Sequence, residues 1–422
     1  MRKALFALAA LMALPVAAET VAITGGRVVT LGPAGTIDGA TVVIRDGKIA
    51  AVGRDVAVPN GARRIDAAGK IVTPGLMDSL SQIGVVEVDA VEATQDSATE
   101  DDRITAAFNV ADAINPRSMV IPVNRIEGLT RAVVAPRARA SLIAGQAVVI
   151  HLGGPGDYLV KSPVAMFGVL GERGMRFGGG SRAAALLRLR EILQDARDFN
   201  ENQKSYERGE RRDYILSRLD LEALQPVIRG ELPLVLTVNR ASDIQTVLRI
   251  AKEEKLKIIL AGVSEAWEVA EDIAAAKVPV LINPMENLPD SFESIGATLE
   301  NAARLHRAGV TFAFMTRDAH NSRNIRQNAG IAVANGLPWD AALAAMTAVP
   351  ARLWGLADRY GTLEPGKDAD VVVWDGDPLE VTSFPEAVFI RGVQIPMESR
   401  QLELRDRYKD VGGTQPHAYR NP

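Results

Sequence analysis

The sequence predicts an α/β protein in which a large central region of alternating strands and helices is joined to a smaller unit of β-strands. In the central region, apolar runs typical of buried strands alternate with helical stretches, as in a parallel sheet or a closed (β/α)8 barrel. At both ends of the chain, short alternating runs are separated by turn residues, as in antiparallel strands. The 422 residues suffice for one large barrel-type domain or for two smaller domains.

The first residues have the pattern of a secretory signal peptide. Arg2 and Lys3 precede an apolar stretch over residues 4–14, and the small residues Val16-Ala17-Ala18 follow. The apolar stretch is shorter than the roughly 20 residues that a membrane-spanning helix needs. We therefore expect cleavage after residues 1–18, before Glu19. The mature chain is then periplasmic or secreted, without membrane insertion.

The small β unit is predicted from two segments that lie far apart in the sequence. Over residues 19–70, runs such as VAITGGRVVTL and GATVVIRDGKIAAVG have strand periodicity, with a turn at Asp46-Gly47. Near the other end, Asp368 to Asp370 lead into an apolar strand over residues 371–374, and EAVFIRGVQIP follows from Glu386. The polar tail over 398–422 is expected to form a helix and then a loose end.

The central region supplies five runs that read as buried strands: AVVAPRA, PLVLTVN, KIILAG, VPVLINP and TFAFMTRD. Helices are predicted over 181–199, 241–254, 265–276 and 295–308. In a parallel sheet or barrel, the chemistry belongs at the carboxyl ends of the strands. The densely charged segment 201–213 is interpreted as a solvated connection, with a mobile loop over the site as the alternative.

The composition excludes several classes of function. The net charge of −4 is small and the charges are mixed, which argues against a nucleic-acid partner. The sequence contains no P-loop, and the glycine run 178–180 lacks the spacing of a dinucleotide-binding motif. The absence of cysteine excludes disulfides and any thiolate nucleophile or metal ligand.

Motifs at both ends of the chain resemble the amidohydrolase superfamily, in particular its imidazolonepropionase-like and dihydroorotase-like members. IRDGKIAAVG and IDAAGKIVTPGLMD are similar to the family's entry into its barrel, and residues 336–378 are similar to its closing helix and return to the β unit. The resemblance implies a (β/α)8 TIM-like barrel over 73–358 and a small β-sandwich formed by 19–72 and 359–397. The signal peptide 1–18 and a C-terminal tail 398–422 lie outside both.

The resemblance also implies a centre with one or two divalent metals, for which this chain lacks the ligands. Leu80 and Gln82 stand where the family has a His-x-His pair, Asn239 stands near the fifth-strand ligand, and Ala261 or Gly262 stands at the next. Leucine cannot coordinate a metal, and amide oxygens are weak donors. We therefore expect no zinc site of the family type and predict no cofactor.

Asp318 is the one family residue that remains, and it is our first candidate catalytic residue. It follows the last apolar strand, at the place of the aspartate that takes a proton from water in the family. The alternative is a helix N-cap or a salt bridge with Arg317 or Arg323. His320, two residues further on, is the second candidate as a base or ligand, with an ordinary loop histidine as the alternative.

Two more residues are assigned, with Leu80, Gln82 and Asn239, to the substrate or former-metal pocket. His151 closes the strand GQAVVI before a glycine-rich turn, and either points into the barrel mouth or caps that turn. Lys161 stands roughly at the place of the family's bridging lysine, or is a surface residue. The acidic run over 87–102 is either a site for calcium or magnesium or a solvated loop.

Two functions remain open from the sequence. The first is an exported enzyme that hydrolyses C–N bonds in a small amide, cyclic ureide or peptide-like substrate with a degenerate metal site. The second is an inactive member of the family that acts as a ligand-binding or assembly module, for instance as the partner of a competent homologue. The missing ligands favour the second and the family resemblance favours the first. A homo-oligomer is also left open.

Overall fold

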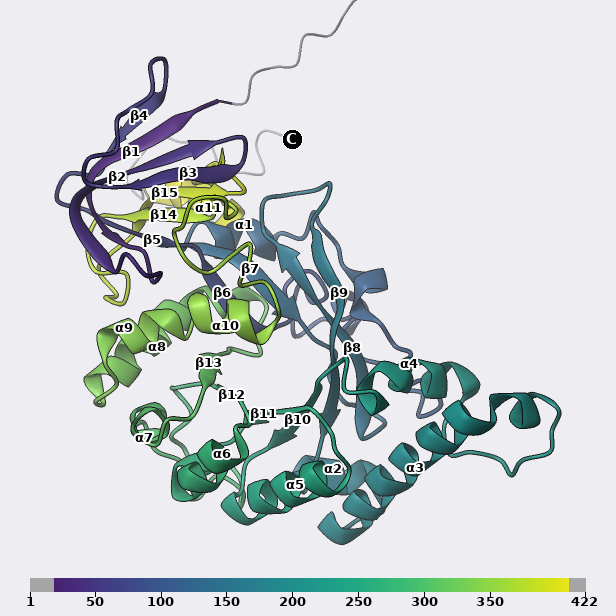
Figure 1. Cartoon of the computed structure of the whole chain (residues 1–422). Helices are drawn as coiled ribbons and strands as arrows, with labels where there is room; N and C mark the ends of the chain where they lie inside the picture. The colour runs from purple at the N-terminus through teal and green to yellow at the C-terminus, as the bar shows by residue number, and fades with distance from the viewer. Residues whose placement is uncertain (1–18, 410–422) are drawn as a thin grey trace, which may run out of the picture.

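The computed structural model describes residues 19–409, which form two eight-stranded sheets and a layer of helices (Figure 1). The predicted signal peptide 1–18 and the end of the tail, 410–422, lie outside the described residues. One sheet combines the first and last strands of the chain. The other sheet forms the central barrel.

The first sheet joins the two ends of the chain, as the split β unit predicts. Strand β5 pairs antiparallel with β14, so that Thr73 lies opposite Val372. Every residue of β14 is buried, in agreement with its uninterrupted apolar run. The strands of this sheet are β1 (Val21–Val29), β2 (Thr36–Arg45), β3 (Lys48–Gly53), β4 (Arg63–Asp66), β5 (Ile71–Pro74), β14 (Val371–Trp374), β15 (Pro385–Ile390) and β16 (Val393–Gln394).

The second sheet is a TIM-like barrel, which confirms the predicted fold class. The Arg317 N–H donates to the Leu80 carbonyl at 2.8 Å and the Gln82 N–H donates to the Asp318 carbonyl at 2.8 Å, so the first and last strands meet and close the barrel. Its strands are β6 (Leu76–Ser81), β7 (Leu129–Val134), β8 (Ile143–His151), β9 (Leu159–Val169), β10 (Leu234–Val238), β11 (Ile258–Gly262), β12 (Val280–Ile282) and β13 (Phe312–Phe314).

Strand β8 departs from the parallel pattern, because it runs antiparallel to both β7 and β9. The connection from β8 to β9 is a seven-residue loop that contains Gly153, Gly154 and Gly156. A short loop of this kind joins antiparallel strands, whereas a parallel crossover needs a dozen or more residues. The carboxyl end of β8 therefore points away from the end of the barrel at which the other strands finish. We call the end at which the other strands finish the barrel mouth.

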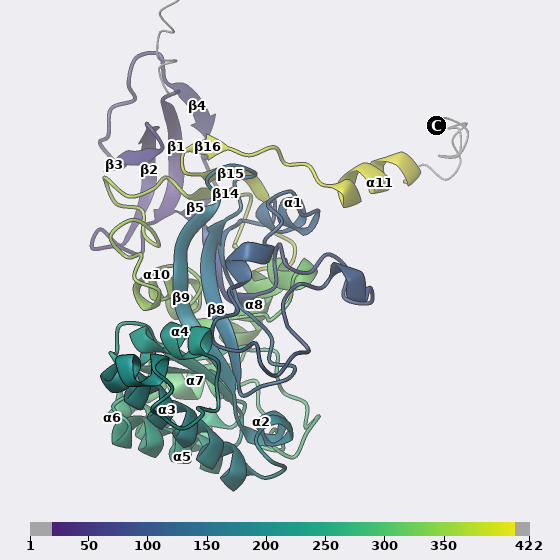
Figure 2. The same cartoon turned by 90° about the vertical axis from the view of Figure 1, so that its right-hand side faces the viewer.

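Helices cover the outside of the barrel and extend beyond it (Figures 1 and 2). The Ser181 side chain accepts the Ala184 N–H at 3.1 Å and so caps α3 at its predicted start. The helices are α1 (Val120–Arg125), α2 (Gly171–Phe177), α3 (Arg182–Glu207), α4 (Arg218–Ile228), α5 (Ala241–Glu253), α6 (Ala270–Ala276), α7 (Asn301–Arg307), α8 (Ile325–Ala334), α9 (Trp339–Ala344), α10 (Ala348–Leu353) and α11 (Arg400–Tyr408). Short 3₁₀ turns are η1 (Glu92–Thr94), η2 (Val110–Ala113), η3 (Ala266–Val269) and η4 (His320–Asn324).

Two helix predictions need adjustment. The helix predicted over 295–308 begins only at Asn301, because the residues before it form a loop in which serines bond to each other and to Asp290. Helix α3 is longer than predicted and takes in the first part of the charged segment 201–213.

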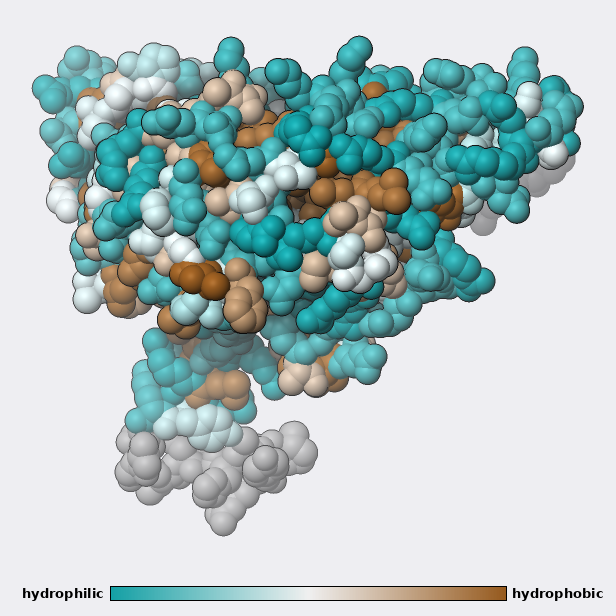
Figure 3. All heavy atoms as spheres, turned by 90° about the horizontal axis from the view of Figure 1, so that it is seen from below, coloured by the Kyte–Doolittle hydropathy of each residue, from teal (hydrophilic) through white to brown (hydrophobic). Residues whose placement is uncertain are grey.

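Seen from below the view of Figure 1, the surface is mostly hydrophilic, with apolar residues in small separate areas (Figure 3).

Within residues 19–409, the structure contains no helix that is both long enough and apolar enough to cross a bilayer.

Candidate functional site

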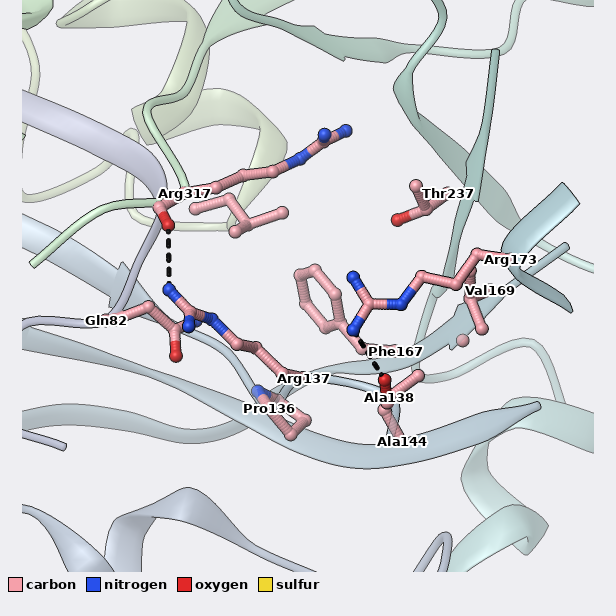
Figure 4. Close-up of a pocket in the computed structure, with 12 residues that line it drawn as sticks. Gln82, Pro136, Arg137, Ala138, Ala144, Phe167, Val169, Arg173, Thr237 and Arg317 are labelled. Atoms are coloured by element: carbon pink, nitrogen blue, oxygen red, sulfur yellow. Dashed lines mark hydrogen bonds between the residues drawn. The ribbon is translucent and has the colours of Figure 1, made fainter. Parts of the chain in front are cut away.

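Two adjoining hollows open at the barrel mouth, and Arg317 lines both. The first, which we call the mouth cavity, has a volume of about 120 Å³, and its lining includes Leu80, Gln82, Arg137, Phe167, Arg173 and Arg317 (Figure 4). The second, the mouth groove, has a volume of about 260 Å³, and its lining includes Asn239, Ser264, Met285, Glu286, Asp290 and Arg317. These hollows lie where the strand ends of an α/β barrel carry its chemistry.

The first strand brings Leu80 and Gln82 to the mouth cavity. Leu80 is buried and packs among the apolar side chains inside the barrel. The Gln82 amide donates to the Ala135 carbonyl at 2.8 Å and to the Ser81 carbonyl at 3.1 Å. Its Oε1 is buried and has no hydrogen-bond partner among residues 19–409. Neither side chain therefore presents an accessible metal ligand to the cavity.

Asn239 reaches the mouth groove instead. It follows β10, and its Oδ1 accepts the Ser264 hydroxyl at 3.4 Å. Gly262 ends β11 with a φ of +88°, and a Cβ there would lie 2.6 Å from Arg317 Nη2 and against Asn239 Oδ1. A glycine is needed at this position because the side chains of Asn239 and Arg317 approach the backbone closely.

Asp318 and His320 lie beside the mouth and line neither hollow. The Asp318 carboxylate accepts the Asn321 N–H at 2.9 Å and the Asn321 side-chain amide at 3.2 Å. The carboxylate is therefore engaged by Asn321 at the start of η4, although the N-cap residue of η4 is Ala319. His320 faces the C-terminal helix, where its Nε2 lies 3.4 Å from the Gln401 amide nitrogen.

His151 and Lys161 lie at the opposite end of the barrel, which corrects their predicted place in the pocket. Because β8 is antiparallel, His151 lies opposite Arg131, near the start of β7. Its Nδ1 accepts the Gly153 N–H at 3.1 Å, so it caps the glycine-rich turn, and burial lowers the pKa of its ring. Lys161 precedes the mouth end of β9 by eight residues, roughly 26 Å of extended strand, and its ammonium donates to the Trp354 carbonyl at 2.9 Å.

The residues at the mouth do not fit a divalent metal of the family type. Among residues 19–409, no group of three or more His, Cys, Asp or Glu side chains is placed to hold a metal ion, and this includes the acidic run over 87–102. Glu87 in that run instead accepts the Asn115 side-chain amide at 3.1 Å and the Met119 N–H at 3.2 Å. The mouth cavity presents three guanidinium groups, which repel a cation.

Glu286 is a mouth residue that the sequence analysis missed. It follows β12, and its N–H donates to the Asn283 carbonyl at 3.1 Å, in a turn that directs the side chain into the mouth groove. Its Oε1 lies 3.5 Å from Arg317 Nη1, and its Oε2 accepts the Ser264 hydroxyl at 3.4 Å. Burial raises the pKa of Glu286, although the Arg317 charge acts in the opposite direction. A carboxylate with a raised pKa is a stronger base than an ordinary glutamate.

The loop that carries Glu286 is fastened at several points. The Gly296 N–H donates to the buried Glu265 carboxylate at 3.0 Å, and the Trp267 indole donates to the Gly296 carbonyl at 2.7 Å. Arg182 binds Glu293 with an Nη2–Oε1 distance of 2.9 Å. These contacts fasten the later part of the loop, whereas Glu286 itself contacts Arg317 and Ser264. Its signal in the sequence was its position two residues after the apolar run VPVLINP, beyond the carboxyl end of a strand.

Buried Asp78 closes the barrel just behind the mouth. Its carboxylate accepts the N–H groups of Leu80 at 3.0 Å and of Thr316 at 3.2 Å, together with the Thr316 hydroxyl. Burial raises the pKa of Asp78 to about 7. The side chain is fully buried and lines neither hollow, so it stabilises the seam between β6 and the segment after β13 without reaching a ligand.

Comparison with known proteins gives consistent similarities. A model of the amidohydrolase family matches residues 229–397. Over 434 residues the chain is 28% identical to a dihydroorotase of Anaeromyxobacter dehalogenans, covering 93% of this chain and 96% of that relative. It is 26% identical over 367 residues to the amidohydrolase tasK of Hapsidospora irregularis, covering 79% of this chain but only 37% of that longer protein. A crystal structure of an amidohydrolase from Thermotoga maritima superposes with a TM-score of 0.80 at 27% identity, over 89% of this chain and 99% of that one.

Proposed function

We propose that this chain, which belongs to the amidohydrolase superfamily, hydrolyses a C–N bond in a small amide or cyclic ureide without a metal centre of the family type. The family relationship supports a hydrolase of C–N bonds. The observation that supports hydrolysis without a metal is the pairing of Glu286 and Arg317 in the mouth groove. These residues offer a base and a cation to the same bound molecule.

In the proposed reaction, the Glu286 carboxylate takes a proton from a water molecule as the water oxygen attacks the carbonyl carbon of the substrate. The C=O electron pair moves to oxygen, and the Arg317 guanidinium donates hydrogen bonds to the resulting oxyanion. Arg317 is placed for this task because it lines the mouth groove, with Nη1 3.5 Å from Glu286 Oε1. As the oxyanion collapses, the C–N bond breaks and the nitrogen takes the proton from Glu286. An open-chain amide gives an acid and an amine, and a cyclic ureide gives a single ring-opened acid in which the released nitrogen remains part of a urea group.

The surroundings of Glu286 support this role. Ser264 donates to its Oε2, and burial keeps its pKa above the usual range, so the carboxylate becomes a stronger base than an exposed glutamate. Asn239 lies in the same groove and bonds to Ser264. It supplies an amide that can orient a polar substrate. No step is assigned to Asp318, because its carboxylate is engaged by Asn321.

The test is turnover by protein that has been treated with EDTA, on a panel of N-acyl amino acids and cyclic ureides including hydantoin and dihydroorotate. We expect Glu286→Gln to lower kcat by about 100-fold or more, the range for loss of a general base. The matched control is Glu300→Gln on the protein surface, where Glu300 pairs with Arg304. Loss of turnover in Asp318→Asn with full turnover in Glu286→Gln would reassign the base to Asp318. Dependence of all turnover on added zinc or manganese would refute the metal-independent proposal.

We also propose that the chain is exported, on the strength of the charged, apolar and small-residue pattern over residues 1–18. Expression of the full chain in a Gram-negative host should give a periplasmic protein whose first residue is Glu19. Intact-mass measurement of the purified protein checks this cleavage. A periplasmic protein that retains Met1, or a protein confined to the cytoplasm, would contradict the proposal.

A further inference from the structure

The mouth cavity carries an unbalanced positive charge. Arg137 follows β7, Arg173 lies in α2 and Arg317 follows β13, so three separate elements each bring a guanidinium to one cavity (Figure 4). None of the twelve lining residues is an aspartate or a glutamate. The cavity wall contains no acidic side chain to balance these three arginines. A bound anion would supply the missing negative charge.

The contacts between these arginines and the protein position them but do not neutralise them. Arg137 Nη2 donates to the Arg317 carbonyl at 3.4 Å, and Arg173 Nη2 donates to the Ala138 carbonyl at 2.8 Å (Figure 4). Both acceptors are neutral backbone groups. These hydrogen bonds therefore hold the Arg137 and Arg173 side chains in place and leave their positive charges uncancelled.

The nearest carboxylates compensate only part of the charge. Asp89 Oδ1 lies 3.9 Å from Arg137 Nη2 and is largely exposed, and Glu286 Oε1 lies 3.5 Å from Arg317 Nη1 on the groove side. No carboxylate of residues 19–409 forms a salt bridge with Arg173. Burial lowers the pKa of Arg173, and repulsion from Arg137 and Arg317 lowers it further. A bound anion would relieve this repulsion.

We propose that the mouth cavity is an oxyanion site, which binds a carboxylate or phosphate group of a small ligand between Arg137, Arg173 and Arg317. Guanidinium groups suit either oxyanion because their parallel N–H donors match two of its oxygens. Leu80 and Phe167 give the cavity apolar walls, which strengthen the attraction by lowering the local dielectric constant. Leu80 and Gln82 stand in this cavity instead of metal-binding histidines, so the mouth attracts an anion and not a metal cation.

The sizes of the two hollows indicate how such a ligand lies. The cavity of about 120 Å³ accommodates a carboxylate or a single phosphate group, and the groove of about 260 Å³ on the other side of Arg317 has room for the rest of a small ligand. Arg317 borders both hollows, and Glu286 lines the groove. The anionic group is thereby anchored beside Glu286, so the substrate class becomes a small amide or ureide that carries an oxyanion. This last step rests on the proposed hydrolase function, whereas the anion site does not.

The test is binding of two simple anions, succinate and inorganic phosphate, by isothermal titration calorimetry at low ionic strength. We expect saturable binding of at least one of them, weakened about tenfold or more in Arg173→Gln and in Arg137→Gln. Tighter binding of succinate would identify the oxyanion as a carboxylate, and tighter binding of inorganic phosphate would identify it as a phosphate. The matched control is Arg176→Gln, which removes the same charge from the same helix but does not line the cavity, and it should bind within twofold of the unaltered protein.

The outcomes separate this inference from the proposed function. Absence of saturable binding of both anions at millimolar concentration would overturn it, as would equal weakening in Arg176→Gln, which would indicate only diffuse attraction. Anion binding by a protein that hydrolyses no amide would support the anion site and refute the hydrolase. Hydrolysis of uncharged and carboxylate-bearing amides at equal rates, unchanged in Arg173→Gln, would support the hydrolase and refute the assignment of an anionic substrate to it.

Discussion

Arg317 and Glu286 form an ion pair across the barrel mouth, with Nη1 and Oε1 3.5 Å apart, although they follow different strands. The Arg317 backbone adopts the left-handed region, with φ at +59°. Non-glycine residues adopt this region at a cost, and such residues are enriched at functional sites. The backbone conformation turns the Arg317 side chain back over the strand ends, where it borders both the mouth cavity and the mouth groove.

The first prediction concerns the pH dependence of hydrolysis. Glu286 acts as a base only when it is ionised, so kcat/KM should fall as the pH drops through its pKa, which burial places above the usual range of a glutamate. Arg317 lowers that pKa by its charge. Arg317→Gln should therefore move the acidic limb of the profile to higher pH, in addition to slowing the reaction. A limb that stays in place or moves to lower pH in this variant would contradict the pairing.

The second prediction concerns Gly262. Gly262→Ala should displace the side chains of Arg317 and Asn239, because the new Cβ would lie 2.6 Å from Arg317 Nη2. We expect about a tenfold loss of succinate or phosphate affinity, measured by calorimetry. The matched control is Gly230→Ala, since Gly230 also has a positive φ, +72°, but a Cβ there meets no atom within 4 Å. Both variants should lose roughly 1–2 kcal/mol of stability from backbone strain, and equal anion affinity in the two would contradict the proposed packing.

The third prediction concerns Asp78, whose pKa of about 7 in the folded state lies above the ordinary value of 3.8. Between pH 4 and pH 7 the folded state holds a proton that the unfolded state has released, so stability falls as the pH rises through this range. The loss approaches roughly 4 kcal/mol at 1.36 kcal/mol per pH unit. Asp78→Asn should remove this slope, because an amide keeps the acceptor for Leu80 and Thr316 without a charge.

Urea unfolding at a series of pH values measures the Asp78 slope. The control Asp38→Asn alters an exposed aspartate that lies 3.8 Å from Arg27, and it should leave the slope as in the unaltered protein. If Asp78→Asn and the unaltered protein lose stability in parallel between pH 4 and pH 7, Asp78 is ionised in the folded state.

The fold followed from the sequence to a large extent because burial imposes simple patterns. The run over 371–374 is wholly apolar and forms the buried strand β14. Periodicity identified the strand that ends at His151, but it carries no information on strand direction. The glycine-rich loop after His151 was the available indication of a hairpin, and the antiparallel direction of β8 is the reason that His151 lies away from the mouth.

The candidate site was harder to predict because its members come from distant segments. Arg137, Arg173 and Arg317 form no local motif, and arginine is common on protein surfaces. Their convergence depends on the closure of the barrel, which brings the residues after β13 beside those after β6 and β7. Glu286 could have been identified from the sequence, since it follows a predicted strand. The family resemblance indicated Asp318 instead, whose carboxylate accepts the Asn321 N–H.

The last prediction concerns Arg131, which joins the barrel to the first sheet. Its side chain is fully buried, with Nη2 2.7 Å from Asp368 Oδ2 and Nε 2.9 Å from Asp370 Oδ2. Arg131→Met should destabilise the protein by about 3–5 kcal/mol, because it leaves buried Asp370 without a cation, whereas Asp368 keeps Lys48 and Arg359. In contrast, Arg218→Met removes an exposed pair with Glu222 and should change stability by less than about 0.5 kcal/mol. Urea unfolding measures both variants. Equal effects would show that the Arg131 pairs are worth no more than a surface ion pair.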